Sequence, residues 1–287
     1  MLQQAANGLV LGMSYALVAT GLTLVFGVLR MMNLSHGELY MLGAYILSAL
    51  MQYLGLPYVV GCVLSVLLVA LIGYFFGMTV VQPASHLEPI NAMLATFGVS
   101  TLLSNLVLLI FKATPRMVSS PFQVVFQIGP VFLTIQKLIV VGMGLLLNLG
   151  VYLVIHHTTF GKMIWAISEQ RTAAEIVGID TKRMHNLAFT MGAVLAAISG
   201  VLVSALYSLA PNMGSGIMTK CFAIVVLGGL GSIPGAIIGG LLLGLAESLF
   251  TIIIPSQWTP AIAFVLLIVL LILKPEGLIG KSKGVKL

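Results

Sequence analysis

Four polar side chains stand between two apolar runs near the start of the chain, in the stretch MMNLSHGELYMLGAYI at residues 31–46: Asn33, Ser35, His36 and Glu38. Within a membrane, such groups either satisfy the free backbone N–H groups at a helix start or contact a polar solute. Asn33, Ser35 and Glu38 are suitable caps, and Gly37 permits a sharp turn. The pattern favours a structural break, with His36 held by a hydrogen bond; direct contact with a translocated solute is the alternative.

A second candidate is Glu247, which lies inside an apolar segment expected to form a helix over residues 235–254. A charged carboxylate at the centre of a bilayer costs about 2.5–3.5 kcal/mol on insertion scales, so it should face a partner, a cavity or a pore. Glu247 is therefore predicted to line a translocation path or to lock two helices together. The alternative is a protonated or hydrogen-bonded carboxyl buried between helices.

The spacing of the remaining reactive residues favours no enzyme activity. The histidines show no H-E-x-x-H pattern and form no cluster with cysteine, so no metal site is predicted. Gly280, Lys281 and Ser282 resemble the end of a phosphate-binding loop, but Pro275 occupies the place of its required first glycine. Because no nucleophile and base stand at a recognisable spacing, we expect neither catalysis nor a cofactor bound by this chain.

The composition is that of an integral membrane protein, since 60% of the 287 residues are hydrophobic and 7% are charged. Continuous apolar runs favour helices over alternating barrel strands, and each crossing helix needs about 20 residues. The sequence predicts an all-α polytopic membrane helix bundle of about eight or nine segments, forming a single domain over residues 1–287. The expected segments are 5–29, 39–55, 57–80, 90–111, 135–155, 186–210, 216–230, 235–254 and 259–273.

The distribution of basic residues predicts the orientation. The positive-inside rule places residues 156–185 and the C-terminal tail in the cytoplasm, which puts the N-terminus outside. The first segment has no basic region and no cleavage pattern, so it is interpreted as an uncleaved span. The net charge of +6 does not indicate nucleic acid, because the basic residues form no solvated domain.

The expected external loop covers about residues 112–134. Two β-branched and aromatic runs, 122–128 and 131–136, are joined by Gly129 and Pro130. Runs of this kind around a turn dipeptide predict a short hairpin on the membrane surface.

The expected cytoplasmic loop, residues 156–185, is longer than a tether requires. Between Lys162 and Val177 it contains no glycine or proline, and Gly178 then supplies a helix stop. This pattern predicts an amphipathic helix. The simpler alternative is an interfacial helix that rests on lipid headgroups.

Glycines dominate the stretch LGGLGSIPGAIIGGLLLGLAES at residues 227–248. Its first half interrupts a helix, and four glycines then recur at spacings that favour close helix approach: Gly235, Gly239, Gly240 and Gly244. Packing without any part in transport is the alternative to a role in the transport cycle.

Four stretches follow one another in this order: GLVLGMSYALVATGLTLVFGVLRMMN, NLSHGELYMLGAY, GKMIWAISEQRTAAEIVGID and GLGSIPGAIIGG. Together they resemble the LivH-type permeases of bacterial branched-chain amino acid ABC importers, over about residues 8–280. The resemblance implies a subunit of the bacterial inner membrane that pairs with a second, LivM-like permease. It also implies two cytoplasmic ATPases, which bind ATP and Mg²⁺, and an external substrate-binding protein.

The same resemblance assigns the cytoplasmic helix to coupling, in which a permease docks onto its ATPase. The positions carried over from the family are Gly161, Ala166, Glu169, Ala173, Ala174 and Gly178. Three further residues of the same segment are also predicted to take part in coupling: Lys162, Trp165 and Glu175. This chain departs from the family at Ile164 and Trp165, where such permeases commonly carry a basic residue. An indole would dock by apolar burial, where a guanidinium would pair with an acid.

Two alternatives remain open at this point. Permeases for urea or short amides share most of these motifs, so the motifs do not fix the solute. A stand-alone secondary transporter or channel is the other alternative, although ionisable residues for ion coupling are few within the expected spans.

Overall fold

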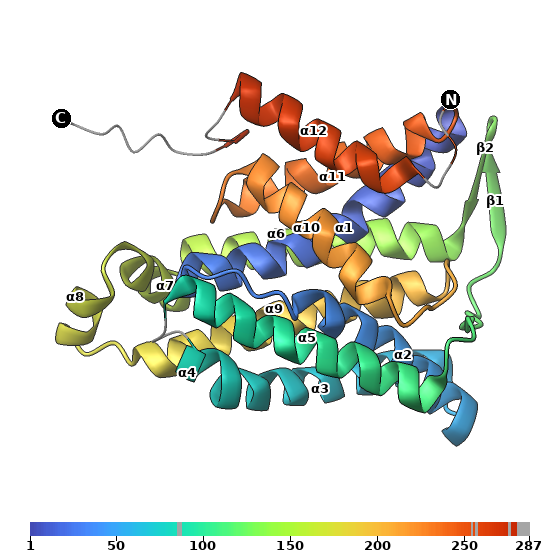
Figure 1. Ribbon diagram of the computed structural model, residues 1–287. Helices are drawn as coiled ribbons and strands as arrows, with labels where there is room; N and C mark the ends of the chain where they lie inside the picture. The colour runs from blue at the N-terminus through green and yellow to red at the C-terminus, as the bar shows by residue number, and fades with distance from the viewer. Residues whose placement is uncertain (85–87, 254, 256–257, 275–276, 280–287) are drawn as a thin grey trace.

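The computed structural model describes residues 1–84, 88–253, 255, 258–274 and 277–279, and it is a bundle of helices with a small hairpin (Figure 1). The first half contains α1 (Leu2–Leu29), α2 (His36–Leu54), α3 (Tyr58–Phe76), a π-helical turn (Gly77–Val81), α4 (Gln82–Ala84) and α5 (Pro89–Phe111). The second half contains β1 (Val125–Ile128), β2 (Val131–Thr134), α6 (Ile135–His157), α7 (Thr159–Glu169), α8 (Arg171–Ile176), α9 (Thr181–Ser204), α10 (Met213–Gly228), α11 (Ile233–Phe250) and α12 (Thr259–Leu273).

Several of these helices have the length and composition of membrane spans. Within the described ranges, six qualify: Leu2–Leu29, Tyr58–Ala84, Ile90–Phe111, Ile135–His157, Thr181–Ser204 and Ile233–Phe250. Two shorter apolar helices cover Met213–Gly228 and Ala261–Leu273. The predicted polytopic helical membrane protein is confirmed, and the count of eight or nine segments stays a prediction.

Helices α1 and α9 form the centre of the bundle. α1 packs against α6, α9, α10 and α11, and α9 also packs against α2 and α3. Most residues of α1 and α9 are buried, whereas α5 presents mainly exposed apolar side chains. An exposed apolar helix is stable in a bilayer, because lipid tails solvate it as well as a protein core would.

Glycines on two helices bring α1 and α11 to backbone distance. Gly8 and Gly12 of α1 face Gly240 and Gly244 of α11, so both helices carry the G-x-x-x-G spacing. A Cβ atom added at Gly240 would lie 2.7 Å from the Cα of Ala16, and one added at Gly244 would meet the backbone of Gly12.

The glycine stripe of α11, formed by Gly235, Gly239, Gly240 and Gly244, is divided between two neighbouring helices. A Cβ at Gly235 would meet the carbonyl oxygen of Gly228, and a Cβ at Gly239 would lie 3.0 Å from the carbonyl oxygen of Ile224. Both contacts are with α10. Spacings of four and five residues do not stay on one side of a helix of 3.6 residues per turn, so the stripe serves α10 at one edge and α1 at the other.

The polar break at residues 30–35 leads the chain back into the bundle, where α2 begins between other helices (Figure 1). The cap differs from the expected one, because Ser35 makes no side-chain hydrogen bond to the helix. Instead, Asn33 Oδ1 accepts from Ser35 N at 3.1 Å and from Ser35 Oγ at 2.7 Å. Gly37 is helical, and a Cβ there would meet the carbonyl oxygen of Gly214, so it permits close approach of α10 instead of a turn.

The predicted hairpin is present with shorter strands. β1 and β2 pair antiparallel from Val125 opposite Thr134 to Ile128 opposite Val131, and Gly129 takes a positive φ of 59° in the turn. α6 begins directly after β2 because the Thr134 side chain caps it by accepting from Lys137 N. The hairpin lies at the end of the bundle opposite α7 and α8 (Figure 1).

The single cytoplasmic helix expected after Lys162 is two helices, α7 and α8, and the first begins earlier, at Thr159. Thr158 starts α7 by accepting from Gly161 N, and extended backbone at Gln170 separates α7 from α8. On either side of this break, α7 buries Ile164 and Ile167 and α8 buries Ala174. In one continuous helix, the buried residues of α7 and α8 would have to follow a single helical repeat.

Candidate functional site

A cavity of about 670 Å³ opens at the hairpin end of the bundle, and we name it the charged cavity. α1, α2, α10 and α11 all contribute side chains to its wall. Its polar lining includes Asn7, Ser14, Tyr15, Tyr40, Lys137, Lys220, Glu247 and Ser248, and its apolar lining includes Leu11, Val203, Leu206, Met213 and Ile217. A polar and an apolar wall thus face the same space.

Three side chains from three helices meet in the wall of the charged cavity. Lys220 Nζ of α10 lies 2.8 Å from Glu247 Oε2 of α11, and the Tyr15 hydroxyl of α1 donates to the same oxygen at 2.8 Å. Lys220 Nζ also donates to the Tyr15 hydroxyl at 2.6 Å and lies 4.7 Å from the centre of its ring. A cation over a ring face is attracted by the ring quadrupole, so Tyr15 holds both charges. We call this the Lys220–Glu247–Tyr15 cluster.

Glu247 therefore has a partner and also lines a cavity, which are two of the three surroundings expected from the sequence, but its position in the helix differs from the expected one. α11 ends at Phe250, which places Glu247 in the last turn of the helix. Lys220 was missed as that partner. The sequence feature that could have identified Lys220 is its isolation, because it is the single charged residue between the uncharged runs 186–219 and 221–246. A lone cation and a lone carboxylate in neighbouring apolar segments are each costly alone and favourable together.

The residues of the polar break lie apart from this cluster. Asn33, Ser35, His36 and Glu38 are all buried, and none lines a described cavity. His36 Nε2 hydrogen-bonds the carbonyl oxygen of Val18 at 3.1 Å, and Glu38 Oε1 accepts from Ser100 Oγ at 3.0 Å. These contacts join the start of α2 to α1 and α5, as a structural break would.

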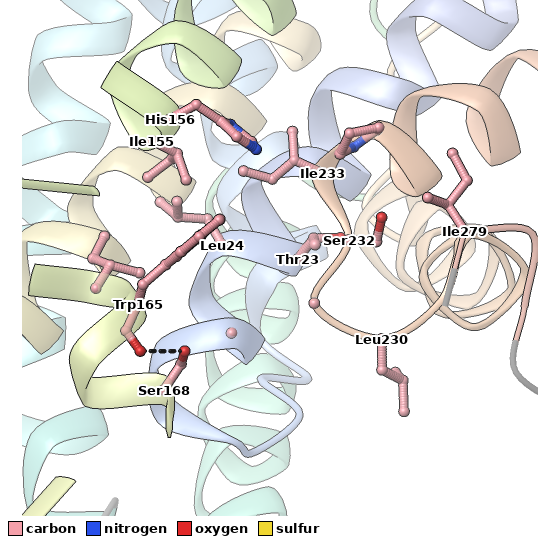
Figure 2. A pocket seen from close by; sticks show the side chains of 14 residues that line it. Thr23, Leu24, Ile155, His156, Trp165, Ser168, Leu230, Ser232, Ile233 and Ile279 are labelled. Carbon is pink, nitrogen blue, oxygen red and sulfur yellow. Dashed lines mark hydrogen bonds between the residues drawn. The ribbon is translucent and has the colours of Figure 1, made fainter. Parts of the chain in front are cut away.

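A second cavity, of about 370 Å³, lies at the opposite end of α1, beside α7 (Figure 2). Figure 2 shows that α6, α7, α1 and the segment before α11 all line it, with Trp165 and His156 on one side and Ile233 on the other. The His156 and Trp165 rings meet edge to face at 5.7 Å between centres. The Trp165 side chain remains 55% exposed, which leaves apolar area uncovered at this end of the molecule.

The predicted coupling residues separate into exposed and buried sets. Lys162, Trp165, Glu169, Ala173, Glu175 and Gly178 are exposed, Ala166 is half-buried, and Gly161 and Ala174 are buried. Gly161 is required by packing, since a Cβ there would meet the carbonyl oxygen of Ile155. The exposed set is therefore available to another protein, and the buried pair holds α7 and α8 in place.

Arg30 links α7 to the polar break. It ends α1 in the left-handed conformation, with φ 52°, and its guanidinium donates to the carbonyl oxygens of Ser168 and Glu169 at the end of α7. A cation at a helix C-terminus is favoured by the helix dipole. The residue after Arg30 begins the segment that leads to α2, so α7 is tied to the chain entering the bundle.

Glu175 is fixed beside the start of α9. Hydrogen bonds from Thr181 Oγ1 at 2.8 Å and from Arg171 Nε at 3.1 Å hold the pKa of the Glu175 carboxyl below its usual value. A depressed pKa means that the ionised form favours the folded loop, and this contribution is lost as the pH falls through the folded-state pKa. Because the carboxyl is exposed, solvent weakens the effect.

Comparison with known proteins relates this geometry to a family. The profile described as "Branched-chain amino acid transport system / permease component" matches residues 4–273. The high-affinity branched-chain amino acid transport system permease protein LivH of Escherichia coli K12 is 32% identical, over 98% of this chain and 96% of its own length. BraD of Pseudomonas aeruginosa, with the same description, is 33% identical over the same shares.

More distant proteins extend the comparison. The autoinducer 2 import system permease protein LsrC of Yersinia enterocolitica is 29% identical over 89% of this chain and 71% of its own. The solved structure of PsaBC from Streptococcus pneumoniae in complex with Fab shares the fold, with a TM-score of 0.50 and 16% identity over 94% of this chain and 91% of that one. The resemblance expected from the sequence is thereby confirmed, and the chain belongs to the family of branched-chain amino acid transport permease components.

Proposed function

We propose that this chain is a permease subunit of an ATP-driven importer and that it forms part of the translocation path for branched-chain amino acids. The observation that carries the proposal is the family match over residues 4–273, together with LivH and BraD relatives that cover 98% of the chain. The importer would contain a second, LivM-like permease, two ATPases that bind ATP and Mg²⁺, and an external substrate-binding protein.

The charged cavity is the proposed start of the path. Its volume of about 670 Å³ exceeds that of a single amino acid, and it combines polar groups with the apolar side chains of Leu11, Leu206 and Ile217. Sites for small molecules are generally apolar, with a few placed polar groups that fix orientation. The cavity supports the proposal by that combination.

The pair α7 and α8 is the proposed ATPase-docking element. The two short helices lie at the end of the bundle opposite the hairpin (Figure 1), and their residues Lys162, Trp165 and Glu169 are exposed. Exposed aromatic and charged side chains on a rigid helix suit a protein interface. Arg30 would pass a movement of α7 to the buried start of α2.

The orientation completes the proposal, with the N-terminus and hairpin outside and α7, α8 and the C-terminus in the cytoplasm of a bacterial inner membrane. Single cysteines replacing Ser119 and Thr172, both exposed, report the two sides once Cys62 and Cys221 are replaced by alanine. We expect an impermeant maleimide to label Ser119→Cys in spheroplasts and Thr172→Cys only in inside-out vesicles. The reverse pattern would contradict the proposed orientation.

Reconstitution tests the function itself. In proteoliposomes that contain both permeases and the ATPases, with binding protein at the external face, we expect ATP-dependent accumulation of radiolabelled L-leucine. The matched control is the same preparation without ATP. Flux of L-leucine through this chain alone would indicate a channel or secondary transporter, and uptake of urea in place of L-leucine would indicate an amide permease.

A further inference from the structure

The Lys220–Glu247–Tyr15 cluster is incomplete on one side. Glu247 Oε2 accepts from both Lys220 and Tyr15, whereas Glu247 Oε1 is buried and has no hydrogen-bond partner among the described residues. The Glu247 side chain is only 2% exposed, so bulk water does not satisfy that oxygen. A buried acceptor without a donor is costly, so Glu247 Oε1 has an unused capacity to accept a hydrogen bond.

The cation of the cluster is turned toward the charged cavity. The Lys220 side chain is 19% exposed, and both Lys220 and Glu247 line the cavity. Lys137, another cation on the wall, already donates to Asn7 Oδ1 at 2.8 Å. Lys220 is thus the ammonium beside the unpartnered carboxylate oxygen.

The need to keep each buried charge paired with an opposite charge limits which solutes can bind to Lys220 and Glu247. A zwitterion can exchange the internal ion pair for two new ones, and no charge is left unpaired at any point. A solute with one charge would strand either Lys220 or Glu247, which is expensive in low-dielectric surroundings. An uncharged amide cannot compete with the internal pair.

We propose that the Lys220–Glu247–Tyr15 cluster binds the head group of an α-amino acid zwitterion during transport. The ligand carboxylate accepts from Lys220, the Glu247 carboxylate turns Oε1 toward the cavity to accept from the ligand ammonium, and the Tyr15 hydroxyl remains the hydrogen-bond donor to Glu247 Oε2. The aliphatic side chain of the ligand packs on Leu11, Leu206 and Ile217. The inference rests on the proposed function and assigns the head-group contacts of the same path.

The test uses the assembled transporter without ATP or binding protein, so that the specificity of the binding protein does not enter. Ser208→Cys, an exposed position on the cavity wall, is the reporter in a chain whose Cys62 and Cys221 are replaced. The measurement is the rate at which a thiol reagent labels it. We expect L-leucine to slow labelling, and we expect 3-methylbutylamine and 4-methylpentanoate to fail at equal concentration, because each lacks one charged group.

A neutral double variant, Lys220→Met with Glu247→Gln, removes both charges without stranding either. The loss of charge-assisted hydrogen bonds lowers the affinity for L-leucine, so we expect the concentration of L-leucine that halves the labelling rate to rise by about tenfold or more. Equal protection by the amine or the carboxylate, or an unchanged half-protecting concentration in the double variant, would overturn the inference. Absent protection in the unmodified cluster alongside ATP-driven L-leucine uptake would also overturn it, while the proposed function would stand; loss of uptake as well would refute both.

Discussion

Gly240→Leu is expected to destabilise the folded chain strongly, even when no partner subunit is present. A Cβ atom at this position would lie 2.7 Å from both the Cα and the N of Ala16, which are backbone atoms and cannot rotate away. Overpacking of a tight interface costs about 1–3 kcal/mol and more when the backbone must shift. We expect loss of monodisperse protein and a lower melting temperature, measured by fluorescence-detected size-exclusion chromatography after heating.

The controls separate side-chain volume from position. Gly142→Leu adds the same volume on α6 at a glycine with no atom within 4 Å, and Leu242→Ile changes shape on α11 at a side chain that is 47% exposed. Both variants should retain the unmodified melting temperature. If Gly240→Leu also does so, then α1 and α11 do not touch at backbone distance.

The destabilisation expected from Gly240→Leu arises from a contact between two helices of this same chain. The sequence alone predicted a close helix approach at Gly240, because the glycine spacing reveals that a neighbouring helix comes near but does not reveal which helix it is. Gly8 and Gly12 carried the complementary signal on α1, and the partner of Gly240 is therefore α1 of the same chain. Two G-x-x-x-G spacings far apart in sequence become one interface only in the folded bundle.

Local features were predicted well because they depend on neighbouring residues. The hairpin turn at Gly129, the helix stop at Gly178 and the break before α11 each follow from backbone conformations that glycine adopts readily. The helix ends were shifted where side chains act as caps. The Asp180 side chain accepts from Arg183 N and caps α9, which therefore begins at Thr181 and not at residue 186. Hydropathy alone does not reveal such a capped helix start.

The parts of the site that escaped prediction are set by tertiary packing. Tyr15 and Glu247 stand 232 positions apart, and only the antiparallel packing of α1 on α11 brings them together. Lys220 could be recognised as unusual, but its partner depends on the packing of α10 against α11. The extended backbone at Gln170 likewise reflects how α7 and α8 contact the bundle, since its sequence surroundings favour a continuous helix.

Gly178→Val is expected to uncouple transport from ATP hydrolysis while the membrane-embedded helices remain folded. Gly178 has a φ of +86°, where a residue with a Cβ is strained by about 1–2 kcal/mol and a β-branched one more. Its backbone N–H donates to the carbonyl oxygen of Glu175, and Ile179 N donates to that of Ala174, so the strain acts on the end of α8. α8 has only six residues and would reorient as a unit.

The measurement compares two rates in the reconstituted importer, ATP hydrolysis and L-leucine uptake. We expect hydrolysis to persist and uptake to fall by about tenfold, which corresponds to 1.36 kcal/mol in the coupled step. Gly178→Asn is the matched control: nothing lies within 4 Å of a Cβ at this position, so volume is not at issue, and asparagine tolerates positive φ better than valine. Normal uptake in Gly178→Val would show that α8 does not transmit the ATPase movement. Equal loss in both variants would show that an open surface at Gly178, and not its backbone conformation, is what the ATPase requires.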